Sequence, residues 1–313
     1  MRFRTKVLAP VARRLASALA VMTGAAAIAF AALQLVPGDP VQILLGQNNT
    51  ASPEVRAQIR ARFGLDESVP LQFLHYLDHL VHGDLGQSYQ LQQPVSGLIS
   101  AQLRPTAQLM AGAMTVAVVL AVSSALLTAG RRPVLRAAAG FCELVAVSAP
   151  SYWVGIVLLT VFSFQLHVFP VAGDQDFASL VLPSITLGLP IAGLLAQVLR
   201  EAMEAALGQP FVLTARARGV GQTGVRLKHA LRHAAIPLVT LTGWLAGSLL
   251  GGAVLVENIF GRPGIGALTL QAATNKDMPV VIALVLVSAL FFVLISTVVD
   301  LLYLLIDPRL RTG

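Results

Sequence analysis

The sequence predicts an all-α polytopic membrane protein with six transmembrane helices. Of its 313 residues, 56% are hydrophobic and 12% are charged, which is far from the average of soluble proteins. Six apolar stretches are long enough to cross roughly 30 Å of hydrocarbon as helices. They are Leu15–Val36, Thr106–Ala129, Leu144–Leu166, Val181–Leu199, Ala234–Val256 and Met278–Val299. None of the six contains a charged residue, so each can lie in lipid without burying a charge.

Positive charge predicts the orientation of these helices, because loops rich in lysine and arginine stay in the cytoplasm. With the N-terminus inside, the inner segments carry 16 of the 22 basic residues. We therefore expect a multi-pass protein of the cell membrane with residues 1–14 and 304–313 in the cytoplasm. The alternative of a cleaved signal peptide at the first span is disfavoured, since the apolar run is too long and no small-x-small cleavage site follows it.

The long loop after the first span, residues 37–105, is predicted to lie outside and to contain two amphipathic helices. Ser52 and Pro53 are suited to begin the first helix and Gly64 to end it. The second is expected to begin near Pro70 and to end before Gly83. Its apolar face is predicted to consist of Leu71, Leu74, Leu77 and Val81. With six acids against four bases, the loop does not suit nucleic acid, and we expect it to pack on the outer mouth or meet an external partner.

Several kinds of chemistry are excluded by missing residues. The single cysteine, Cys142, rules out an internal disulfide and a thiolate metal cluster. No GxxxxGK[ST], HExxH or GxSxG motif occurs, so the chain is not predicted to be an enzyme. The string from Gly219 to Gly224 fits GxGxxG, but no strand precedes it and no acid follows about twenty residues on. We expect these glycines to form a turn between two short helices and no cofactor to bind this chain.

Histidines form two further patterns. His75, His79 and His82 stand at i, i+4 and i+7 in the outer loop, a spacing that could present three imidazoles to a metal ion. A hydrated helix face is the favoured alternative. His229 and His233 also stand four residues apart, but they alternate with basic residues that repel a cation, so docking or packing is expected for them.

Three acids, Glu143, Glu257 and Asp300, stand at the edges of predicted spans. An ionisable residue within a bilayer is a functional candidate by default, but edge positions can reach headgroup water, which favours a structural role. The sequence shows no acid at the middle of a span. A proton-coupled transporter would be expected to have one.

Glycines recur at four-residue intervals in the fifth span, at Gly243, Gly247 and Gly251. This spacing lines up small residues on one helix face and predicts close approach of another helix. The neighbour is either another helix of this chain or a second subunit.

A basic loop, residues 204–233, separates the fourth and fifth spans. From Phe211 to Thr240 the sequence contains five arginines and lysines and no acid. A segment of this kind at the cytoplasmic face can contact lipid headgroups, nucleic acid or a protein. The residues alone thus predict an exposed docking loop.

The same loop resembles the coupling motif of ABC importer permeases of the dipeptide, oligopeptide and nickel family. The resemblance rests on Thr214–Val220, which reads TARARGV, and on His229–Pro237, which reads HALRHAAIP. Phrases similar to that family recur in the same order at Leu35–Pro40, Gly83–Ser88, Val256–Phe260, Pro263–Gly266, Val299–Tyr303 and Asp307–Arg309. Three positions depart from the pattern: no glutamate stands near Leu213, His233 replaces an asparagine, and Asn275–Pro279 replaces Arg-Asp-x-Pro.

The resemblance implies a type I importer permease with a MetI-like fold. Its parts would be the first span at 15–36, the outer loop at 37–105 and a permease core at 106–303. It implies a pathway shared with a second homologous permease, two ATP-binding subunits that hold ATP and magnesium, and an external binding protein. It also implies that ATPase coupling falls on Arg216, Ala217, Arg218, Gly219, Val220, His229 and Arg232. An ATP-independent secondary transporter is the alternative. Dipeptides, oligopeptides, glutathione, nickel chelates and opines all remain open as the solute.

Overall fold

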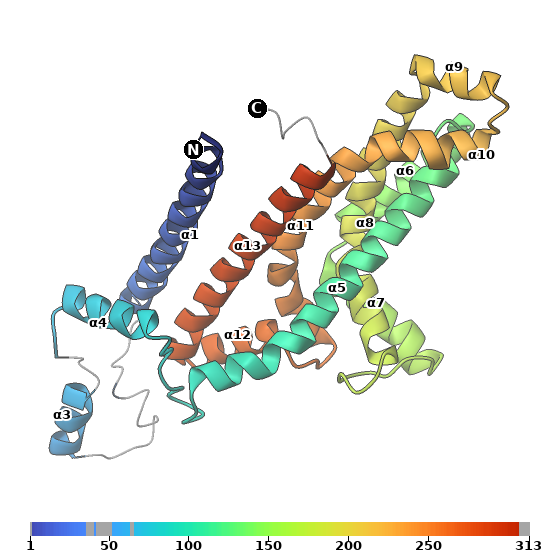
Figure 1. The fold of residues 1–313 in the computed structure, drawn as a ribbon. Coiled ribbons are helices and arrows are strands. Elements are labelled where there is room, and N and C mark those ends of the chain that lie inside the picture. Colours follow the sequence, from blue (N-terminus) through green and yellow to red (C-terminus); the bar gives the residue numbers. More distant parts are fainter. Residues whose placement is uncertain (1, 36–40, 42–51, 63–65, 307–313) are drawn as a thin grey trace. The chain divides into compact units, whose positions relative to one another are not determined.

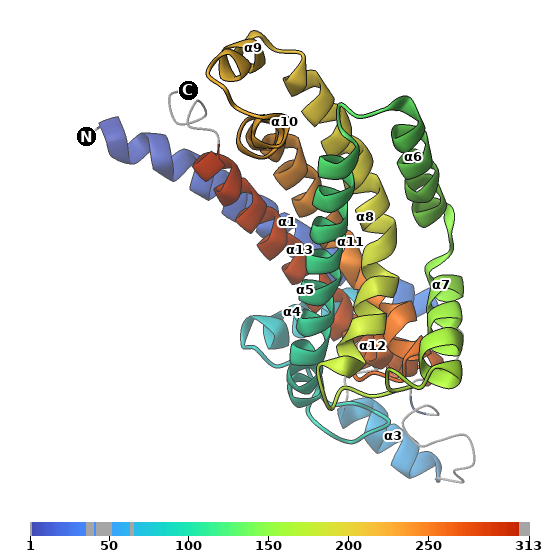
Figure 2. The ribbon, with the colours of Figure 1, turned by 90° about the vertical axis from the view of Figure 1, so that its right-hand side faces the viewer.

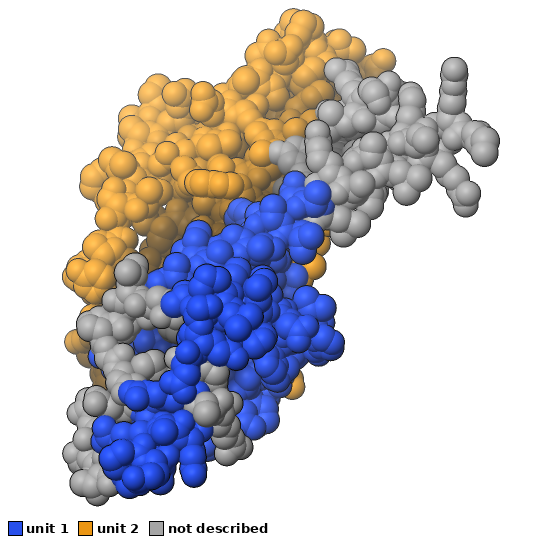
Figure 3. Space-filling model, turned by 90° about the vertical axis from the view of Figure 1, so that its left-hand side faces the viewer, with its two compact units in different colours: residues 1–103, 268–293 blue, residues 104–267, 294–313 orange. Residues whose placement is uncertain are grey.

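The computed structural model describes residues 2–35, 41, 52–62 and 66–306 (Figure 1). Apart from one isolated antiparallel bridge between Gln87 and Pro94, the regular structure in this part is helical. The chain forms two compact units, residues 1–103 with 268–293 and residues 104–267 with 294–313 (Figure 3). The predicted phrases at 36–40 and 307–309, Gly64 as a helix end and the Asp300 side chain lie outside the described residues and side chains.

The first unit is built from α1 (Arg2–Leu35), α3 (Pro53–Arg62), α4 (Val69–Val81), most of α12 (Ile265–Thr274) and the first part of α13 (Met278–Ile306). As predicted, α3 begins after Ser52, whose hydroxyl accepts a hydrogen bond from the Val55 amide at 3.5 Å. Ala26 of α1 and Ile282 and Leu286 of α13 form a small buried core.

The apolar face predicted for α4 is wrong. Phe73, Tyr76, Leu77 and Leu80 pack against the core of the first unit, whereas the other predicted members, Leu71, Leu74 and Val81, are exposed. The predicted set mixed residues from two sides of the helix, and the two aromatic rings bury more apolar area than the leucines they replace. Gly83 ends the helix region as expected, with φ +77°.

The second unit packs long helices against one another. It contains α5 (Val95–Thr128) from Arg104 onward, α6 (Pro133–Ser148), α7 (Ser151–Leu158), the π-helix η1 (Leu159–Gln165), α8 (Ala178–Leu207) and α11 (Leu231–Ile259). Figure 2 shows α8 between α5 on one side and α6 and α7 on the other. One face of α5 carries a fully buried alanine at every fourth position, namely Ala113, Ala117, Ala121 and Ala125, and Ala129 continues the row just after the helix. This small-residue face lets neighbouring backbones approach closely.

Two glycines of α8 lie close to the backbone of neighbouring helices. A Cβ atom added to Gly188 would stand 2.4 Å from the Ala113 carbonyl oxygen of α5, and one added to Gly193 would stand 2.7 Å from the Glu143 carbonyl oxygen of α6. Both obstacles are backbone atoms, which cannot move aside as a flexible side chain can. The helix spacing around α8 therefore depends on these two glycines.

The predicted spans correspond to helices with two differences. Within the described residues, four helices are long and apolar enough to cross a membrane: Val95–Thr128, Ala178–Leu207, Gln222–Ile259 and Met278–Val298. The third predicted span, Leu144–Leu166, is wrong as one continuous helix, because the chain bends by 102° between Ser148 and Ser151. Pro150 lacks a backbone N–H and forces the residue before it into an extended conformation, which explains the break. The first span appears as a shorter apolar stretch, Ala16–Ala32, within α1.

Candidate functional site

The basic loop folds into a short helix and a return turn at the end of α8. Helix α9 (Pro210–Ala217) begins with proline at a first-turn position, where its missing N–H is not needed. Gly219, with φ +81°, ends it. The Gly219 amide donates to the Arg216 carbonyl at 2.9 Å, and the Val220 amide donates to the Ala215 carbonyl at 3.1 Å. This is the Schellman arrangement, which satisfies the last carbonyl groups of a helix.

The chain returns through α10 (Gln222–Gly224) and the π-helix η2 (Val225–Ala230) into α11. The prediction that the glycines of this stretch form a turn between short helices is confirmed. A small buried core of Val212, Ala215 and Val225, with Phe211 and Val220 beside them, joins α9 to this return. In the second unit, the loop lies beyond the ends of α8 and α11, at the opposite extremity from α7 (Figure 1).

One side of the loop is exposed, and we call it the basic tip: Leu213, Thr214, Arg216, Ala217, Arg218 and Gly219. Four of the predicted coupling residues, Arg216 to Gly219, belong to it. Leu213 was not predicted, although 68% of its surface is exposed. The sequence did contain a signal for this exposure. Leu213 is a large apolar residue near two arginines, and helical periodicity places it on the other side of the helix from Val212 and Ala215.

The other predicted coupling residues differ in exposure. Val220 packs against the core of the loop. His229 is half-buried, with its ring 6.4 Å from the Phe211 ring, and His233 stacks on the same ring at 4.5 Å. Arg232 is exposed. The two histidines thus pack on Phe211, as the packing alternative predicted, and the basic tip is composed of α9 residues and the two residues that follow it.

Arg226 ties the loop to the end of α5. Its side chain is buried, and its Nη2 atom donates to the Gly130 carbonyl oxygen at 3.2 Å. Gly130 has φ +62°, a left-handed conformation that suits glycine where a helix ends. Arg226 thus joins the loop to α5, and the loop continues directly into α11.

A buried ion pair braces the same end of the helices. Arg200 of α8 donates from both terminal nitrogens to the two carboxylate oxygens of Glu143 in α6, each at 2.6 Å, and Ser124 of α5 donates to the same carboxylate at 2.8 Å. The two charged side chains are 13% and 6% exposed. Three helices thus meet at one carboxylate. Glu143 has the structural role that was predicted, but it pairs with arginine and does not reach headgroup water.

Glu257 is likewise buried and structural. It accepts a hydrogen bond from the Thr106 hydroxyl at 2.6 Å and from the Ala267 amide at 2.9 Å, while the Ile265 amide donates to Thr106. A carboxylate at the first amides of a helix is favoured by the helix dipole. Glu257 therefore fixes the start of α12, and the expectation that it reaches headgroup water was wrong because α5 covers it.

At the far end of α12, Asp277 organises the loop that follows α4. It is buried and accepts hydrogen bonds from the Ser88 hydroxyl and from the Tyr89 and Gln90 amides, the latter two at 3.0 and 3.3 Å. Burial, together with the Asp277 charge, raises the pKa of Tyr89. The motif Gly83–Ser88 thus leads from α4 into the loop that Asp277 binds.

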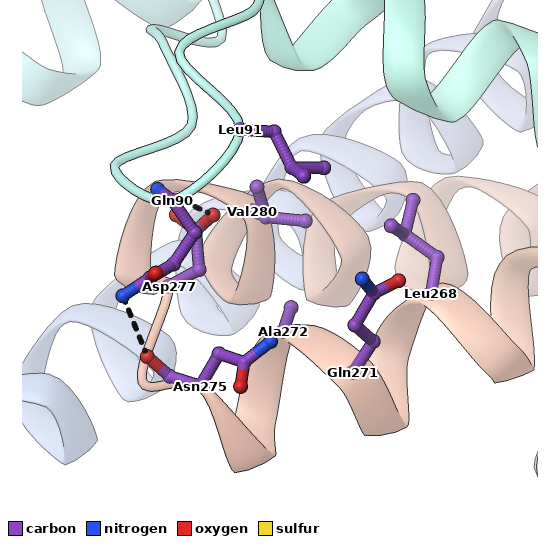
Figure 4. Close-up of a pocket in the computed structure, with 8 residues that line it drawn as sticks. All are labelled: Gln90, Leu91, Leu268, Gln271, Ala272, Asn275, Asp277 and Val280. Carbon is purple, nitrogen blue, oxygen red and sulfur yellow. Dashed lines mark hydrogen bonds between the residues drawn. The ribbon is translucent and has the colours of Figure 1, made fainter.

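Beside Asp277 lies a small pocket of about 20 Å³, room for about one water molecule (Figure 4). Gln90 bridges its rim by donating to the Asn275 carbonyl oxygen at 3.3 Å. The exposed side chains that line it are Gln90, Leu91, Gln271 and Asn275. The three amides form a polar rim suited to contact with a protein surface. The pocket itself is too small for a peptide.

The metal hypothesis for the outer histidines is not supported. His75, His79 and His82 contact three different carboxylates, those of Glu67, Asp84 and Asp78. No group of three or more ligand side chains able to hold a metal ion occurs among the described residues. All three rings are exposed, which agrees with the hydrated helix face.

The predicted glycine face has open space beside Gly251. Gly252 meets Leu187 of α8, at 2.6 Å from an added Cβ, whereas no atom lies within 4 Å of one added to Gly251. The close approach within this chain is therefore made one residue away from the predicted face. The role of Gly243, Gly247 and Gly251 in packing against a second subunit stays a prediction.

Nearly the whole chain is similar to one family of membrane transport proteins. Residues 117–312 match the family described as "Binding-protein-dependent transport system inner membrane component", and residues 7–121 match the N-terminal component of the same kind of system. The chain belongs to this family. Together the matched regions cover almost its whole length, and the family is that of the predicted resemblance rather than of a secondary transporter.

Named relatives resemble this membrane component along their whole length. It is 36% identical over 302 residues to "Glutathione transport system permease protein GsiC" of Salmonella choleraesuis (strain SC-B67), covering 96% of this chain and 98% of the relative. It is 37% identical over 310 residues to "Probable peptide ABC transporter permease protein y4tP" of Sinorhizobium fredii, with the same coverage.

The fold is that of a solved importer. Chains from two crystal forms of the inward-facing MetNI methionine ABC transporter match with TM-scores of 0.54 and 0.56. They are 16% and 17% identical in sequence, and the matches cover 68% and 67% of this chain and 97% and 96% of those chains. The predicted MetI-like, all-α membrane fold is thereby confirmed.

Proposed function

We propose that this membrane component is a translocation subunit of an ATP-driven importer for small peptides, including tripeptides of the size of glutathione. The observation that carries the proposal is the full-length similarity to relatives named as glutathione and peptide permeases. The chain would share the pathway with a second, homologous permease. An external binding protein would deliver the solute.

Two separate ATP-binding subunits would hold ATP and magnesium and hydrolyse the nucleotide, so this chain would not itself be an enzyme. It has no phosphate-binding loop, as its sequence shows. The basic tip would contact one of these subunits on the cytoplasmic side. An exposed leucine followed by two exposed arginines suits a groove with an apolar floor and an acidic rim.

Movement would pass from the tip to the helices as a rigid-body shift. The core of Val212, Ala215 and Val225 joins the two arms of the loop, and Arg226 links the loop to α5 through Gly130. A displaced tip would therefore displace the ends of α5, α8 and α11. Among the predicted coupling residues, Val220 and His229 would act by holding the tip in shape.

The rim of Gln90, Gln271 and Asn275 would meet the binding protein on the outer side. Its three amides are exposed and uncharged, and the exposed Leu91 lies beside them. Such amides suit the hydrogen-bonded, water-rich contacts of transient complexes. Asp277 would fix the position of Gln90 in this rim through its hydrogen bonds to the loop.

Charge reversal at the basic tip tests the coupling role. We expect Arg218→Glu combined with Leu213→Asp, in the reconstituted complex with the second permease, ATPases and binding protein, to lower peptide-stimulated ATP hydrolysis at least about tenfold, because both the apolar anchor and the charge complementarity are lost. Arg104→Glu, the same arginine-to-glutamate change at an exposed site on α5, is the control. Size-exclusion chromatography separates loss of coupling from loss of assembly.

The coupling role is refuted if the assembled double variant hydrolyses ATP and imports peptide as the control does. The importer proposal itself fails if the chain moves solute in liposomes without any ATPase. Competition of unlabelled dipeptides, glutathione and longer peptides against one labelled peptide then defines the solute class.

A further inference from the structure

Arg262 is a buried cation that the proposed coupling mechanism does not use. It lies in the turn between α11 and α12, and only 3% of its surface is exposed. Its Nη2 atom donates to the Gln108 side chain at 3.4 Å, which is a long hydrogen bond. The Nε and Nη1 atoms are buried and have no hydrogen-bond partner among the described residues. Most N–H groups of this guanidinium are therefore unsatisfied in the structure.

A buried guanidinium without partners is unfavourable, so the groups around it matter. Burial lowers the pKa of Arg262, and the negative charges of Asp174 and Glu257 oppose this shift. In the part of the chain that the structure describes, neither carboxylate is bonded to Arg262. The cation thus has two acids nearby and pairs with neither.

Glu257 is held in place by other groups. Its carboxylate accepts hydrogen bonds from the Thr106 hydroxyl of α5 and the Ala267 amide of α12. A turn of this carboxylate toward Arg262 would break the bonds that fix the start of α12. Glu257 therefore compensates part of the charge of Arg262 at a distance but does not supply the missing hydrogen bonds.

The Asp174 carboxylate is not engaged elsewhere. Asp174 lies in the loop between η1 and α8, residues 166–177, and it is exposed. It forms no hydrogen bond or ion pair with the residues that the structure describes. Asp176 of the same loop differs, because it accepts a hydrogen bond from the Ser179 amide at 2.8 Å at the start of α8. Of the two acids in this loop, Asp174 is thus the one available to another partner.

The backbone brings this loop beside the turn after α11. The Gly173 amide donates to the Phe260 carbonyl oxygen at 3.3 Å. A Cβ atom added to Gly261 would stand 3.1 Å from the Ala172 Cβ atom. The next residue on each of the two segments is one of the charged residues, the acid on the loop and the arginine on the turn. A small movement of one segment along the other therefore brings the two charges together.

We propose that Asp174 and Arg262 close into an ion pair in one state of the transport cycle and separate in the other, which is the state of this structure. The pair would join the loop before α8 to the turn after α11. The opposite ends of the same two helices meet the basic loop. A shift of the basic loop that moves α8 relative to α11 would thus open or close the pair. This link to the transport cycle rests on the proposed function.

Other partners for Arg262 fit less well. A water molecule could accept from one or two N–H groups, but it would leave the buried charge uncompensated. An acid of a second permease would have to reach a side chain that is already covered within this chain. Asp174 supplies both the negative charge and the acceptor atoms from a segment that already touches the turn.

Hydrogen exchange of residues 171–177 tests the pair. The complete complex, with the second permease, ATPases and binding protein, is compared without nucleotide and with a non-hydrolysable ATP analogue plus magnesium. In the wild type we expect exchange of this segment to differ about tenfold between the two states, as expected for a charge-assisted hydrogen bond. Asp174→Asn should abolish the difference. Asp176→Asn, the same change of charge on the same loop, should retain it, because asparagine still caps a helix.

Two further variants test the partners separately. Asp174→Glu keeps the carboxylate and should retain the difference between the states. Arg262→Gln should abolish it, and adding Asp174→Asn to Arg262→Gln should have no further effect, because the two residues act as one pair. If Arg262→Gln does not assemble, the comparison of Asp174→Asn with Asp174→Glu decides, since both change an exposed position.

Two outcomes would overturn the ion pair alone. One is a complex that hydrolyses ATP while residues 171–177 exchange alike in both nucleotide states, and the other is a difference that persists in Asp174→Asn. A wild-type complex that hydrolyses no ATP overturns the importer proposal and the pair with it. The ATPase assay and the exchange measurement thus distinguish failure of the pair from failure of the proposed function.

Discussion

Single carboxylates decide how the helices of this membrane component are held. Glu143 receives both terminal nitrogens of Arg200 and the Ser124 hydroxyl, so three helices depend on one side chain. Removing one partner of a buried ion pair leaves the other charge buried and uncompensated, which is more damaging than losing the attraction alone.

We predict that Glu143→Gln destabilises the chain by about 3–5 kcal/mol. The neighbouring pair of Arg136 and Glu204 is more exposed, so Arg136→Gln should cost about 1 kcal/mol or less. Unfolding of the purified chain in mixed detergent micelles by increasing dodecyl sulfate measures both. Equal losses for the two variants would show that the pair at Glu143 is not specially buried.

Tyrosine burial in the first unit predicts alkaline sensitivity. Burial raises the pKa of Tyr76 to about 12 from its usual 10, and its hydroxyl has no hydrogen-bond partner among the described residues. Because the pKa is higher in the folded state than in the unfolded state, the unfolded chain loses this proton first as the pH rises. The contribution of the neutral Tyr76 to the free energy of unfolding is therefore complete below pH 10 and is lost between about pH 10 and about pH 12.

We therefore predict that the wild-type chain loses about 1–2 kcal/mol between pH 10 and 12 that Tyr76→Phe does not lose. The variant should match the wild type at pH 8, because no hydrogen bond is removed. Chemical unfolding at several pH values, followed by tryptophan fluorescence, measures the difference. Parallel pH profiles for the two proteins would contradict the burial of this hydroxyl.

At the scale of elements, helix spacing depends on where glycines meet backbone. Gly188 faces the Ala113 carbonyl group, whereas the space next to Gly251 is open. The same substitution at these two positions therefore has opposite expected effects.

We predict that Gly188→Ala destabilises the chain by about 1–3 kcal/mol through overpacking, which outweighs the roughly 1 kcal/mol gained in helix propensity. Gly251→Ala should leave the stability of the isolated chain unchanged or raise it. Dodecyl sulfate titration of both variants measures this. Lower assembly of Gly251→Ala with the second permease, while the chain itself stays stable, would show that the predicted glycine face contacts that subunit. Unchanged stability of Gly188→Ala would refute the close packing of α5 and α8.

At the scale of the whole molecule, the chain is a multi-pass membrane protein whose orientation is a prediction from its basic residues. We predict that, in a Cys142→Ser background, a membrane-impermeant maleimide labels Asn275→Cys from outside intact cells and labels Thr214→Cys only after permeabilisation. Both positions are exposed, so accessibility to reagent is not limited by folding. The reverse pattern would place the basic tip outside and exclude contact with cytoplasmic ATPases.

Much of the fold was predictable because a bilayer permits few solutions. Apolar length and the absence of internal charges indicated the long helices, and Ser52-Pro53 with Gly83 indicated the ends of the two outer helices. The break at Pro150 was missed because hydropathy does not register a bend. The face of α4 was misplaced because four apolar residues at near-helical spacing did not distinguish the packed side from the exposed one.

The sequence by itself determined the membrane class, the family, the basic loop and most of its exposed residues, since these follow from composition, charge and local motifs. Only the tertiary structure decided which side chains meet across distant segments: Glu143 with Arg200, Asp277 with the loop at Ser88, and Arg226 with Gly130. The physical reason is that periodicity assigns a residue to a face of its own helix, whereas the partner on that face depends on how separate helices pack.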